Sequence, residues 1–263
     1  PIADKDTFVK RFNEEKVCDR EKTDESIRKI FDLPDAATGT DDEIIRCEDV
    51  KISYGNRTIL KNFNWSVKRG EHWALSGENG AGKSTLLSLV CADNPQAYAC
   101  NISLFGFKRG CGESIWDIKK KIGYVSPEMY RSYKKNLPAV DIVASGLHDS
   151  VGLYKRVTDE EREKVLFWMD IFGVGSLAQR PYLQLSSGEQ RMLLLVRAFV
   201  KDPELLVLDE PFHGLDEHRR MLARAVIDAF CKRKGKTLIM VTHYEEEYPA
   251  SIDHKLKLKK IID

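Results

Sequence analysis

Apolar residues follow two strand-like patterns in the part of the chain that begins at Ile44. In IIRCEDVKISY (44–54) and NRTILKNFNWSV (56–67) they alternate with polar residues. This alternation is typical of antiparallel strands with one buried face. HWALSG (72–77), LLVLDE (205–210) and TLIMVTH (237–243) are short and mostly apolar. Such runs suit strands that are buried on both faces of a parallel sheet.

Three further segments have the spacing of helices. KSTLLSLVC (83–91) carries its leucines on one face, DEEREKVLFWMDIFG (159–173) is amphipathic, and SGEQRMLLLVRAFVKD (187–202) has a long apolar stripe. The stretch from Glu128 to Leu185 is rich in helix-forming residues. Together these patterns predict an α/β fold.

Residues 1–43 are more polar than the rest. They contain two helix-like stretches, Thr7–Val17 and Asp24–Phe31, and turn signals at Leu33-Pro34 and at 38–42. We interpret 1–43 as a linker, or as an N-terminal arm packed on a neighbouring domain, and 44–263 as the folded domain. Because the chain begins with Pro1, we expect a fragment or a processed form of a longer protein.

Composition narrows the class of protein. Lys and Arg total 42 and Asp and Glu total 41. The net charge therefore gives no sign of nucleic-acid binding, and nucleic acid is not an expected partner. A local basic patch is still possible. The longest apolar run, Met192–Val196, is far shorter than the roughly 20 residues of a membrane span. The cysteines form no CxxC pair, which favours reduced thiols and a cytoplasmic location.

One glycine-rich segment matches the phosphate-loop pattern G-x-x-x-x-G-K-[ST]. Glycines let backbone N–H groups turn toward phosphates, and the following helix adds its positive end. Lys83 is expected to reach the β- and γ-phosphates, and the Ser84 hydroxyl to ligate Mg²⁺. A chance glycine-rich turn is the alternative, but a predicted strand precedes the loop and a predicted helix follows it. The predicted nucleotide-binding residues of the loop are Gly77, Glu78, Asn79, Gly80, Ala81, Gly82, Lys83, Ser84 and Thr85.

Two carboxylates end the apolar strand 205–210. Ligands of open parallel sheets bind beyond the carboxyl ends of the strands. Asp209 is therefore expected to hold the metal and Glu210 to polarise the attacking water. Two solvated acids at a strand end would be the ordinary interpretation if no phosphate loop were present.

Further motifs follow in a fixed order. Leu185-Ser186-Ser187-Gly188-Glu189-Gln190 resembles the LSGGQ signature of ABC ATPases, Gly214-Leu215-Asp216 resembles their D-loop, and Val241-Thr242-His243 resembles their switch-histidine strand. Tyr54 occupies the place of the aromatic residue that stacks on adenine. The resemblance covers 44–263. It implies a P-loop NTPase of ABC type, with a mixed parallel sheet core, an antiparallel β subdomain and an inserted α-helical subdomain at about 128–190.

The resemblance also implies roles for these residues. Two domains would face each other head to tail, with each ATP between the phosphate loop of one and the signature loop of the other. Ser186, Ser187, Gly188 and Glu189 would contact the ATP of the partner. His243 would act on the γ-phosphate or the attacking water, and Asp216 would lie in the D-loop. ATP and Mg²⁺ are the implied cofactors, and ATP hydrolysis is the implied reaction.

A narrower resemblance is carried by RGEHWALSGENGAGKSTLLSLVC (69–91), IWDIKKKIGYVS (115–126) and LVLDEPFHGLD (206–216). These segments are similar to the second half of ModF-type proteins, which have two ATPase halves in tandem and are associated with molybdate transport. The implied partner is a second ABC domain, either an identical copy or a missing tandem half.

The chain departs from the family pattern at two places. The signature has Ser187 for glycine and Glu189 for glutamine, and Ser126-Pro127-Glu128 replaces the region of the usual magnesium-sensing glutamine. Either Ser126 or Glu128 takes over that contact, or it is lost. Two functions therefore stay open. One is a transporter motor that works with membrane subunits and is peripheral on the inner face of the membrane. The other is a soluble ATP-driven switch. The full set of motifs argues against an inactive scaffold.

Overall fold

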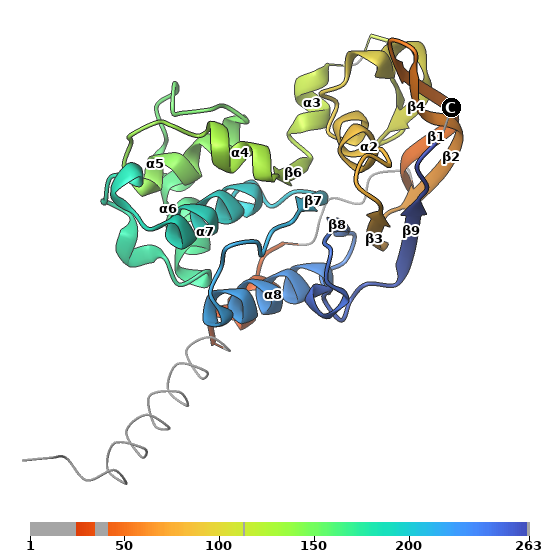
Figure 1. The fold of residues 1–263 in the computed structure, drawn as a ribbon. Helices are drawn as coiled ribbons and strands as arrows, with labels where there is room; N and C mark the ends of the chain where they lie inside the picture. Colours follow the sequence, from red (N-terminus) through yellow and green to blue (C-terminus); the bar gives the residue numbers. More distant parts are fainter. Residues whose placement is uncertain (1–24, 35–41, 113, 262–263) are drawn as a thin grey trace, which may run out of the picture.

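A computed structural model describes residues 25–34, 42–112 and 114–261 of the chain. The fold has two sheets, with a group of helices beside them (Figure 1). The smaller sheet has the order β2-β1-β4-β5 and the larger sheet the order β6-β7-β8-β3-β9. The strands are β1 Glu43–Tyr54, β2 Arg57–Lys68, β3 His72–Gly77, β4 Asn101–Leu104, β5 Phe107–Lys108, β6 Ile122–Val125, β7 Leu205–Asp209, β8 Thr237–Val241 and β9 His254–Leu258.

Parallel and antiparallel pairing are divided between the two sheets. In the larger sheet the described pairings are all parallel, and in the smaller sheet they are antiparallel. The alternating segments 44–54 and 56–67 are the antiparallel hairpin β1–β2, and the apolar runs are β3, β7 and β8. The predictions for these strands are confirmed.

Each side of the larger sheet covers a separate apolar core, which explains the unbroken apolar runs. Along β7, Leu205 and Val207 point into a core shared with α2 and the antiparallel sheet. Leu206 and Leu208 point into the other core, shared with α7 and α8. All four side chains are fully buried. A polar residue at any of these positions would be buried on one face or the other, so the strand carries none.

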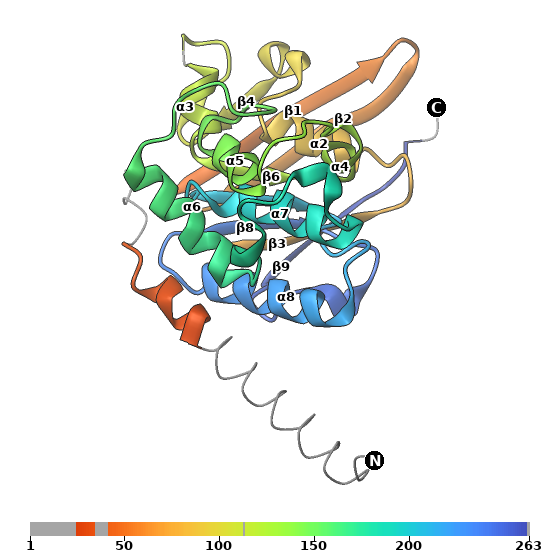
Figure 2. The ribbon, with the colours of Figure 1, turned by 90° about the vertical axis from the view of Figure 1, so that its left-hand side faces the viewer.

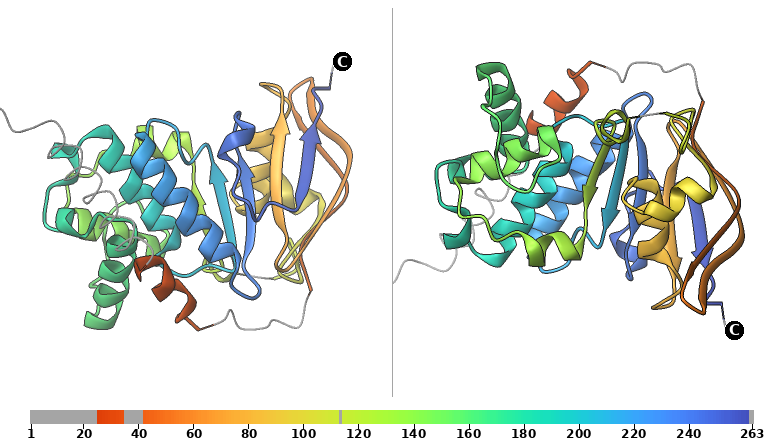
Figure 3. Two further views of the ribbon diagram at one scale, coloured as in Figure 1. Left: turned by 90° about the horizontal axis from the view of Figure 1, so that it is seen from below. Right: turned by 90° about the horizontal axis from the view of Figure 1, so that it is seen from above.

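The helices lie on both sides of the larger sheet and beside it (Figures 1 and 3). The α-helices are α2 Lys83–Val90, α3 Ile115–Lys119, α4 Pro127–Ser132, α5 Ala139–Ala144, α6 Asp159–Ile171, α7 Ser187–Phe199 and α8 Glu217–Cys231. The 3₁₀ helices are η1 Pro95–Ala99, η2 Ser145–His148, η3 Gly175–Leu177, η4 Tyr182–Gln184 and η5 Glu245–Glu247. Helices α4, α5 and α6 lie in the stretch of about 128–190 for which the sequence predicts a helical subdomain, and α7 begins at its end.

Part of the N-terminal region packs on the domain. Residues 25–31 are helical and lie near α6 and α8 (Figures 2 and 3). Ile30 is fully buried in the core that contains α6, α7 and α8. Arg233 donates to the backbone carbonyl of Pro34 at 2.7 Å and forms an ion pair with Asp202 at 2.5 Å. The predicted helix Thr7–Val17 lies outside the described residues.

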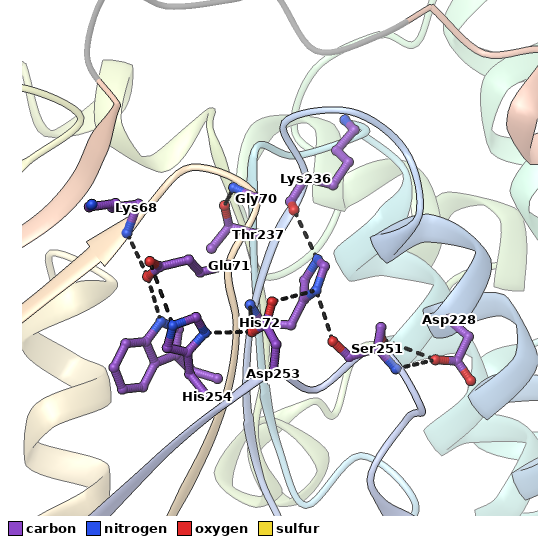
Figure 4. Close-up of polar contacts among 11 residues, drawn as sticks. Lys68, Gly70, Glu71, His72, Asp228, Lys236, Thr237, Ser251, Asp253 and His254 are labelled. Atoms are coloured by element: carbon purple, nitrogen blue, oxygen red, sulfur yellow. Dashed lines mark hydrogen bonds and ion pairs between the residues drawn. The ribbon is translucent and has the colours of Figure 1, made fainter.

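Strand β9 is joined to β3 by polar contacts at the end of the sheet opposite the phosphate loop (Figure 4). The His72 backbone N–H donates to Asp253 Oδ1 at 2.8 Å, and the His254 ring nitrogen Nδ1 lies 2.6 Å from the same oxygen. The His254 ring stacks on Trp73 with ring centroids 4.7 Å apart. These contacts fix the edge strand against the strand that carries the phosphate loop.

Candidate nucleotide site

The phosphate loop joins the end of β3 to the start of α2, so the predicted strand–loop–helix order is confirmed. The loop needs glycine at both of its ends. At Gly82, which has φ 98°, an added Cβ would lie 2.8 Å from Ile59 Cγ2. At Gly77 it would lie 2.6 Å from the carbonyl oxygen of Leu258. The backbone therefore passes too close to β2 and β9 for any side chain.

Lys83 is the first residue of α2 and its side chain bends back over the loop. Its Nζ donates to the carbonyl of Gly77 at 2.6 Å and to that of Glu78 at 3.3 Å. The ammonium group thus lies inside the turn made by the loop, at the helix end where positive charge already accumulates. This arrangement favours an anion such as phosphate.

Two acidic residues meet this loop from the end of β7. Burial raises the pKa of Asp209 to about 6, and the neighbouring charge of Glu210 adds to the effect while Lys83 opposes it. Glu210 has a left-handed backbone with φ 49°, and its N–H donates to the carbonyl of Val241 at 2.9 Å. This turn directs the two consecutive carboxylates differently.

His243 follows β8, the parallel neighbour of β7. Its Nε2 lies 3.0 Å from Glu210 Oε1. The loop that carries it is anchored one residue earlier, because the Thr242 hydroxyl donates to the buried carboxylate of Glu247. The histidine and the glutamate therefore meet as a pair at the carboxyl edge of the sheet.

A cavity of about 710 Å³ brings these groups together. It is large enough for a nucleotide, since ligand cavities run from about 300 to 1,000 Å³. Of the residues proposed from the sequence, Glu78, Asn79, Gly80, Gly82, Lys83, Ser84, Thr85, Asp209, Glu210 and His243 line it. Gly77 and Ala81 do not; Ala81 is buried beneath the loop.

Other lining residues had no signal in the sequence. Arg57 and Ile59 reach the cavity from β2, and Arg57 Nη2 donates to the carbonyl of Gly80 at 3.3 Å. Asp93 and Arg131 complete its polar rim. These side chains are brought to the loop only by the packing of the hairpin and of α4.

Tyr54 lies beside the cavity and is not one of its lining residues. Its side chain at the end of β1 is 52% exposed. The hydroxyl accepts a hydrogen bond from Asn94 Nδ2 at 3.0 Å. Asn94 in turn contacts Ser88, which does line the cavity.

The signature segment lies at the start of α7 and does not line this cavity; Ser187 lines a smaller pocket of about 280 Å³ that shares Pro127, Arg131 and Glu210 with it. Ser186 and Glu189 form a capping box: the Ser186 hydroxyl accepts from the Glu189 N–H at 3.3 Å, and Glu189 Oε2 accepts from the Ser186 N–H at 2.8 Å. Ser186 and Ser187 are exposed. Asp216 caps α8 and accepts from the Arg219 N–H at 2.8 Å. None of the four signature residues, nor Asp216, lines the 710 Å³ cavity.

The segment Ser126-Pro127-Glu128, which replaces the usual glutamine, lines the cavity. Ser126 is buried and also caps α4, accepting from the Met129 N–H at 3.4 Å. Glu128 lines the cavity, and its charge helps to raise the pKa of Asp209. Glu128 is thus the acidic group of this segment that faces the phosphate loop.

The fold and the site together define a P-loop nucleotide-binding ATPase. The ABC transporter family matches residues 60–213. The chain is 47% identical over 207 residues to the "ABC transporter ATP-binding protein ModF" of Escherichia coli, a match that covers 78% of this chain and 42% of that protein. It is 34% identical to the uncharacterised ABC transporter ATP-binding protein YlmA of Bacillus subtilis, covering 82% of each chain.

Solved structures agree with this assignment. The chain is 26% identical to CbiO1 of Clostridium perfringens, part of an ABC transporter complex, with a TM-score of 0.67 over 84% of this chain and 88% of that one. A dimeric ATP-binding cassette in a post-hydrolysis state with ADP and Pi has the same fold, with a TM-score of 0.70, 22% identity, and coverage of 82% and 96%.

The chain belongs to the ABC transporter family and is one of its nucleotide-binding ATPase domains, which hydrolyse ATP. It spans less than half the length of the ModF relative. Within residues 25–34, 42–112 and 114–261, no helix combines the length and the apolar character that crossing a bilayer requires.

Proposed function

We propose that this domain binds ATP with Mg²⁺ in the 710 Å³ cavity and hydrolyses it as one half of an ATP sandwich with a second ABC domain. The observation that carries the proposal is that the signature segment is exposed and does not line that cavity. Ser186 and Ser187 are exposed at the start of α7 and line no part of it. The start of a helix attracts phosphate, so a nucleotide held by another domain is proposed as the ligand of this exposed helix start.

The residues present fit a magnesium ion. Ser84 and Asp209 offer oxygen atoms, which are the ligands that Mg²⁺ prefers. Burial beside Glu210 raises the pKa of Asp209 to about 6, and a cation would relieve that repulsion. In the described part of the chain no group of three or more His, Cys, Asp or Glu side chains forms a metal site, as expected where phosphates supply other ligands. When bound, Mg²⁺ neutralises charge that develops on the phosphates.

The protein groups have separate tasks in the proposed reaction. Lys83 holds the phosphates and Glu210 accepts a hydrogen bond from the water that attacks the γ-phosphorus. A new bond forms from the water oxygen to that phosphorus as its bond to the bridging oxygen breaks; the water proton passes by way of Glu210 to the phosphate, and ADP and inorganic phosphate leave. His243, at 3.0 Å from Glu210, orients the carboxylate or contacts the γ-phosphate. In this proposal Glu128 takes the place of the usual glutamine, because Ser126 is occupied as a helix cap.

The second domain is proposed to be the other half of a tandem protein of the ModF type. The chain matches 42% of the length of ModF, which leaves room for a second half. An identical copy of this chain is the other candidate for the partner.

A soluble ATP-driven switch without transport is the second candidate function. It is favoured by the segment Ser126-Pro127-Glu128, because the glutamine that usually couples the ATPase to a membrane subunit is absent from it. The same hydrolysis would then drive a change in a protein partner.

The test is the assembly state of Glu210→Gln. This substitution keeps the size of the side chain and removes the charge that polarises water. With ATP and Mg²⁺, the variant is expected to accumulate as an ATP-bound dimer, measured by size-exclusion chromatography with light scattering across a concentration series. This chain could pair only weakly with an identical copy of itself. In that case, adding the proposed tandem half should strengthen the dimer.

Two controls accompany this test. Glu163→Gln, an exposed residue on α6, should behave as the wild type. Ser186→Arg added to Glu210→Gln should abolish the dimer, whereas Ser114→Arg at the exposed start of α3 should leave it intact. A dimer that forms equally with ADP, or one that persists with Ser186→Arg, would refute the sandwich arrangement.

A further inference from the structure

Tyr54 is held in place by a short segment that no motif marks. The segment comprises Asn94 and Gln96, between α2 and β4. Asn94 is 5% exposed, although it is a polar residue. Polar side chains that are this deeply buried are held by hydrogen bonds, so the partners of Asn94 indicate what it does.

The hydrogen bonds of Asn94 define the orientation of its amide. Oδ1 accepts from the backbone N–H of Gln96 at 3.0 Å, so Nδ2 faces the other way. Nδ2 donates to the Tyr54 hydroxyl at 3.0 Å and to Ser88 Oγ at 3.1 Å. Both amide hydrogens are therefore used, one on β1 and one on α2.

Ser88 connects this pair to the phosphate loop. Its hydroxyl donates to the carbonyl of Thr85 at 2.7 Å, within the first turns of α2. Thr85 and Ser88 both line the 710 Å³ cavity. The tip of the Tyr54 ring is thus tied through Asn94 to the helix that begins at Lys83.

Gln96 holds the backbone beside Tyr54. Its Nε2 donates to the carbonyl of Ser53 at 3.1 Å, and its Oε1 accepts from the Ser53 N–H at 3.4 Å. Asn94 and Gln96 therefore hold the end of β1 at two points, the ring hydroxyl and the preceding peptide. Without them, an aromatic side chain that is 52% exposed would be free to change rotamer.

We propose that Asn94 is a positioning residue for nucleotide binding, which fixes the Tyr54 ring as the platform on which the adenine base stacks. The inference rests on the proposed function, ATP binding in the 710 Å³ cavity, and takes Tyr54 as the residue that stacks on adenine, the role that the family resemblance implies for it. A platform fixed before binding loses less conformational entropy when the base stacks on it. The Tyr54 hydroxyl accepts the hydrogen bond from Asn94, which holds the ring from the side of α2.

The experiment compares ATP with inorganic tripolyphosphate, which has phosphates and no base. Tyr54→Phe and Asn94→Ala should each weaken ATP about two- to tenfold, the effect of freeing one side chain. The double variant should bind ATP no more weakly than Asn94→Ala, because both single variants remove the hydrogen bond between Asn94 and Tyr54. Affinity for tripolyphosphate, measured by calorimetry with Mg²⁺, should not change in any of them.

Three further variants complete the design. Tyr54→Ala, which removes the ring, should weaken ATP more than Tyr54→Phe does. Asn94→Asp keeps the acceptor for the Gln96 N–H and lets the Tyr54 hydroxyl donate to a carboxylate. The ATP affinity of this variant should therefore lie within about twofold of that of the wild type. The matched control is Asn101→Ala on β4, whose amide contacts Glu48 on the antiparallel sheet; it should bind both ligands as the wild type does.

The outcomes separate this inference from the proposed function. If Asn94→Ala weakens tripolyphosphate as much as ATP, Asn94 supports the phosphate loop and the inference is wrong. The inference is also wrong if Tyr54→Ala weakens ATP while Asn94→Ala and Tyr54→Phe do not. If Tyr54→Ala leaves ATP affinity unchanged, Tyr54 does not meet the base and the inference is wrong, whereas the proposed hydrolysis in the 710 Å³ cavity is not contradicted.

Discussion

His243 Nε2 and Glu210 Oε1 lie 3.0 Å apart, at the ends of the neighbouring parallel strands β8 and β7. Glu210 has a left-handed backbone conformation, which costs energy for a residue with a side chain. The cavity that contains both side chains also contains Lys83 and Asp209. A strained acid paired with a histidine beside a phosphate loop is the arrangement on which the proposed role of this pair in hydrolysis rests.

His243→Ala should lower kcat for ATP about 10- to 100-fold and leave KM nearly unchanged. A hydrogen bond to a charged group is worth roughly 1.5–3 kcal/mol, and this one is expected to act in the reaction step. Phosphate release at saturating ATP measures the effect. His218→Ala, an exposed histidine on α8, is the matched control. An unchanged kcat would mean that the His243–Glu210 pair plays no part in hydrolysis.

Lys83→Ala should weaken ATP binding by about 100-fold. The variant loses the ammonium group at the turn of the loop, and charge-assisted bonds are worth roughly 1.5–3 kcal/mol each. Titration with a fluorescent nucleotide measures the affinity. Lys61→Ala on β2, an exposed lysine that does not line the cavity, should bind normally. Equal affinities of Lys83→Ala and the wild type would exclude this loop as the phosphate site.

Glu189 should make folding stability depend on acid pH. Its hydrogen bonds from the Ser186 hydroxyl and N–H hold the pKa of Glu189 below its ordinary value of 4.5. Because the folded-state pKa is lowered, the stabilisation is present above pH 4.5 and is lost as pH falls through the folded-state value. The loss should be about 1 kcal/mol, the usual worth of a helix cap.

Urea unfolding of the nucleotide-free protein between pH 7 and pH 3 tests this, with Glu189→Gln as the comparison. The difference in free energy of unfolding between the two proteins should shrink as pH falls. Glu163→Gln, at an exposed position of α6, controls for the general effect of removing a carboxylate. Parallel curves for wild type and Glu189→Gln would show that the capping box carries no pH dependence.

Ile30→Ala should lower the free energy of unfolding of the whole domain by about 2–5 kcal/mol, the usual cost of truncating a buried isoleucine. Ile30 is fully buried and packs in the core that contains α6, α7 and α8. The neighbouring Phe31 is 50% exposed, so Phe31→Ala should cost much less. Chemical denaturation measures both. If Ile30→Ala costs no more than Phe31→Ala, the segment 25–34 does not contribute to the stability of the domain.

The sequence by itself was sufficient for the features that depend on neighbouring residues. The phosphate loop from Gly77 to Thr85 is a continuous pattern, and a strand and a helix flank it as predicted. The apolar runs 205–210 and 237–243 were predicted to be strands buried on both faces of a parallel sheet, and they contain β7 and β8. These features are local, so their hydrogen bonds and burial are encoded within a few residues.

The tertiary structure decided everything that joins distant residues. It brought Arg57 and Ile59 to the loop, turned Glu128 toward Asp209, and buried Ile30 beneath the helices. It also placed Asn94 between Tyr54 and Ser88, where a buried amide must satisfy both of its donors. No pattern of spacing predicts these contacts, because they arise from the packing of separate strands and helices onto two shared cores and not from the conformation of any one segment.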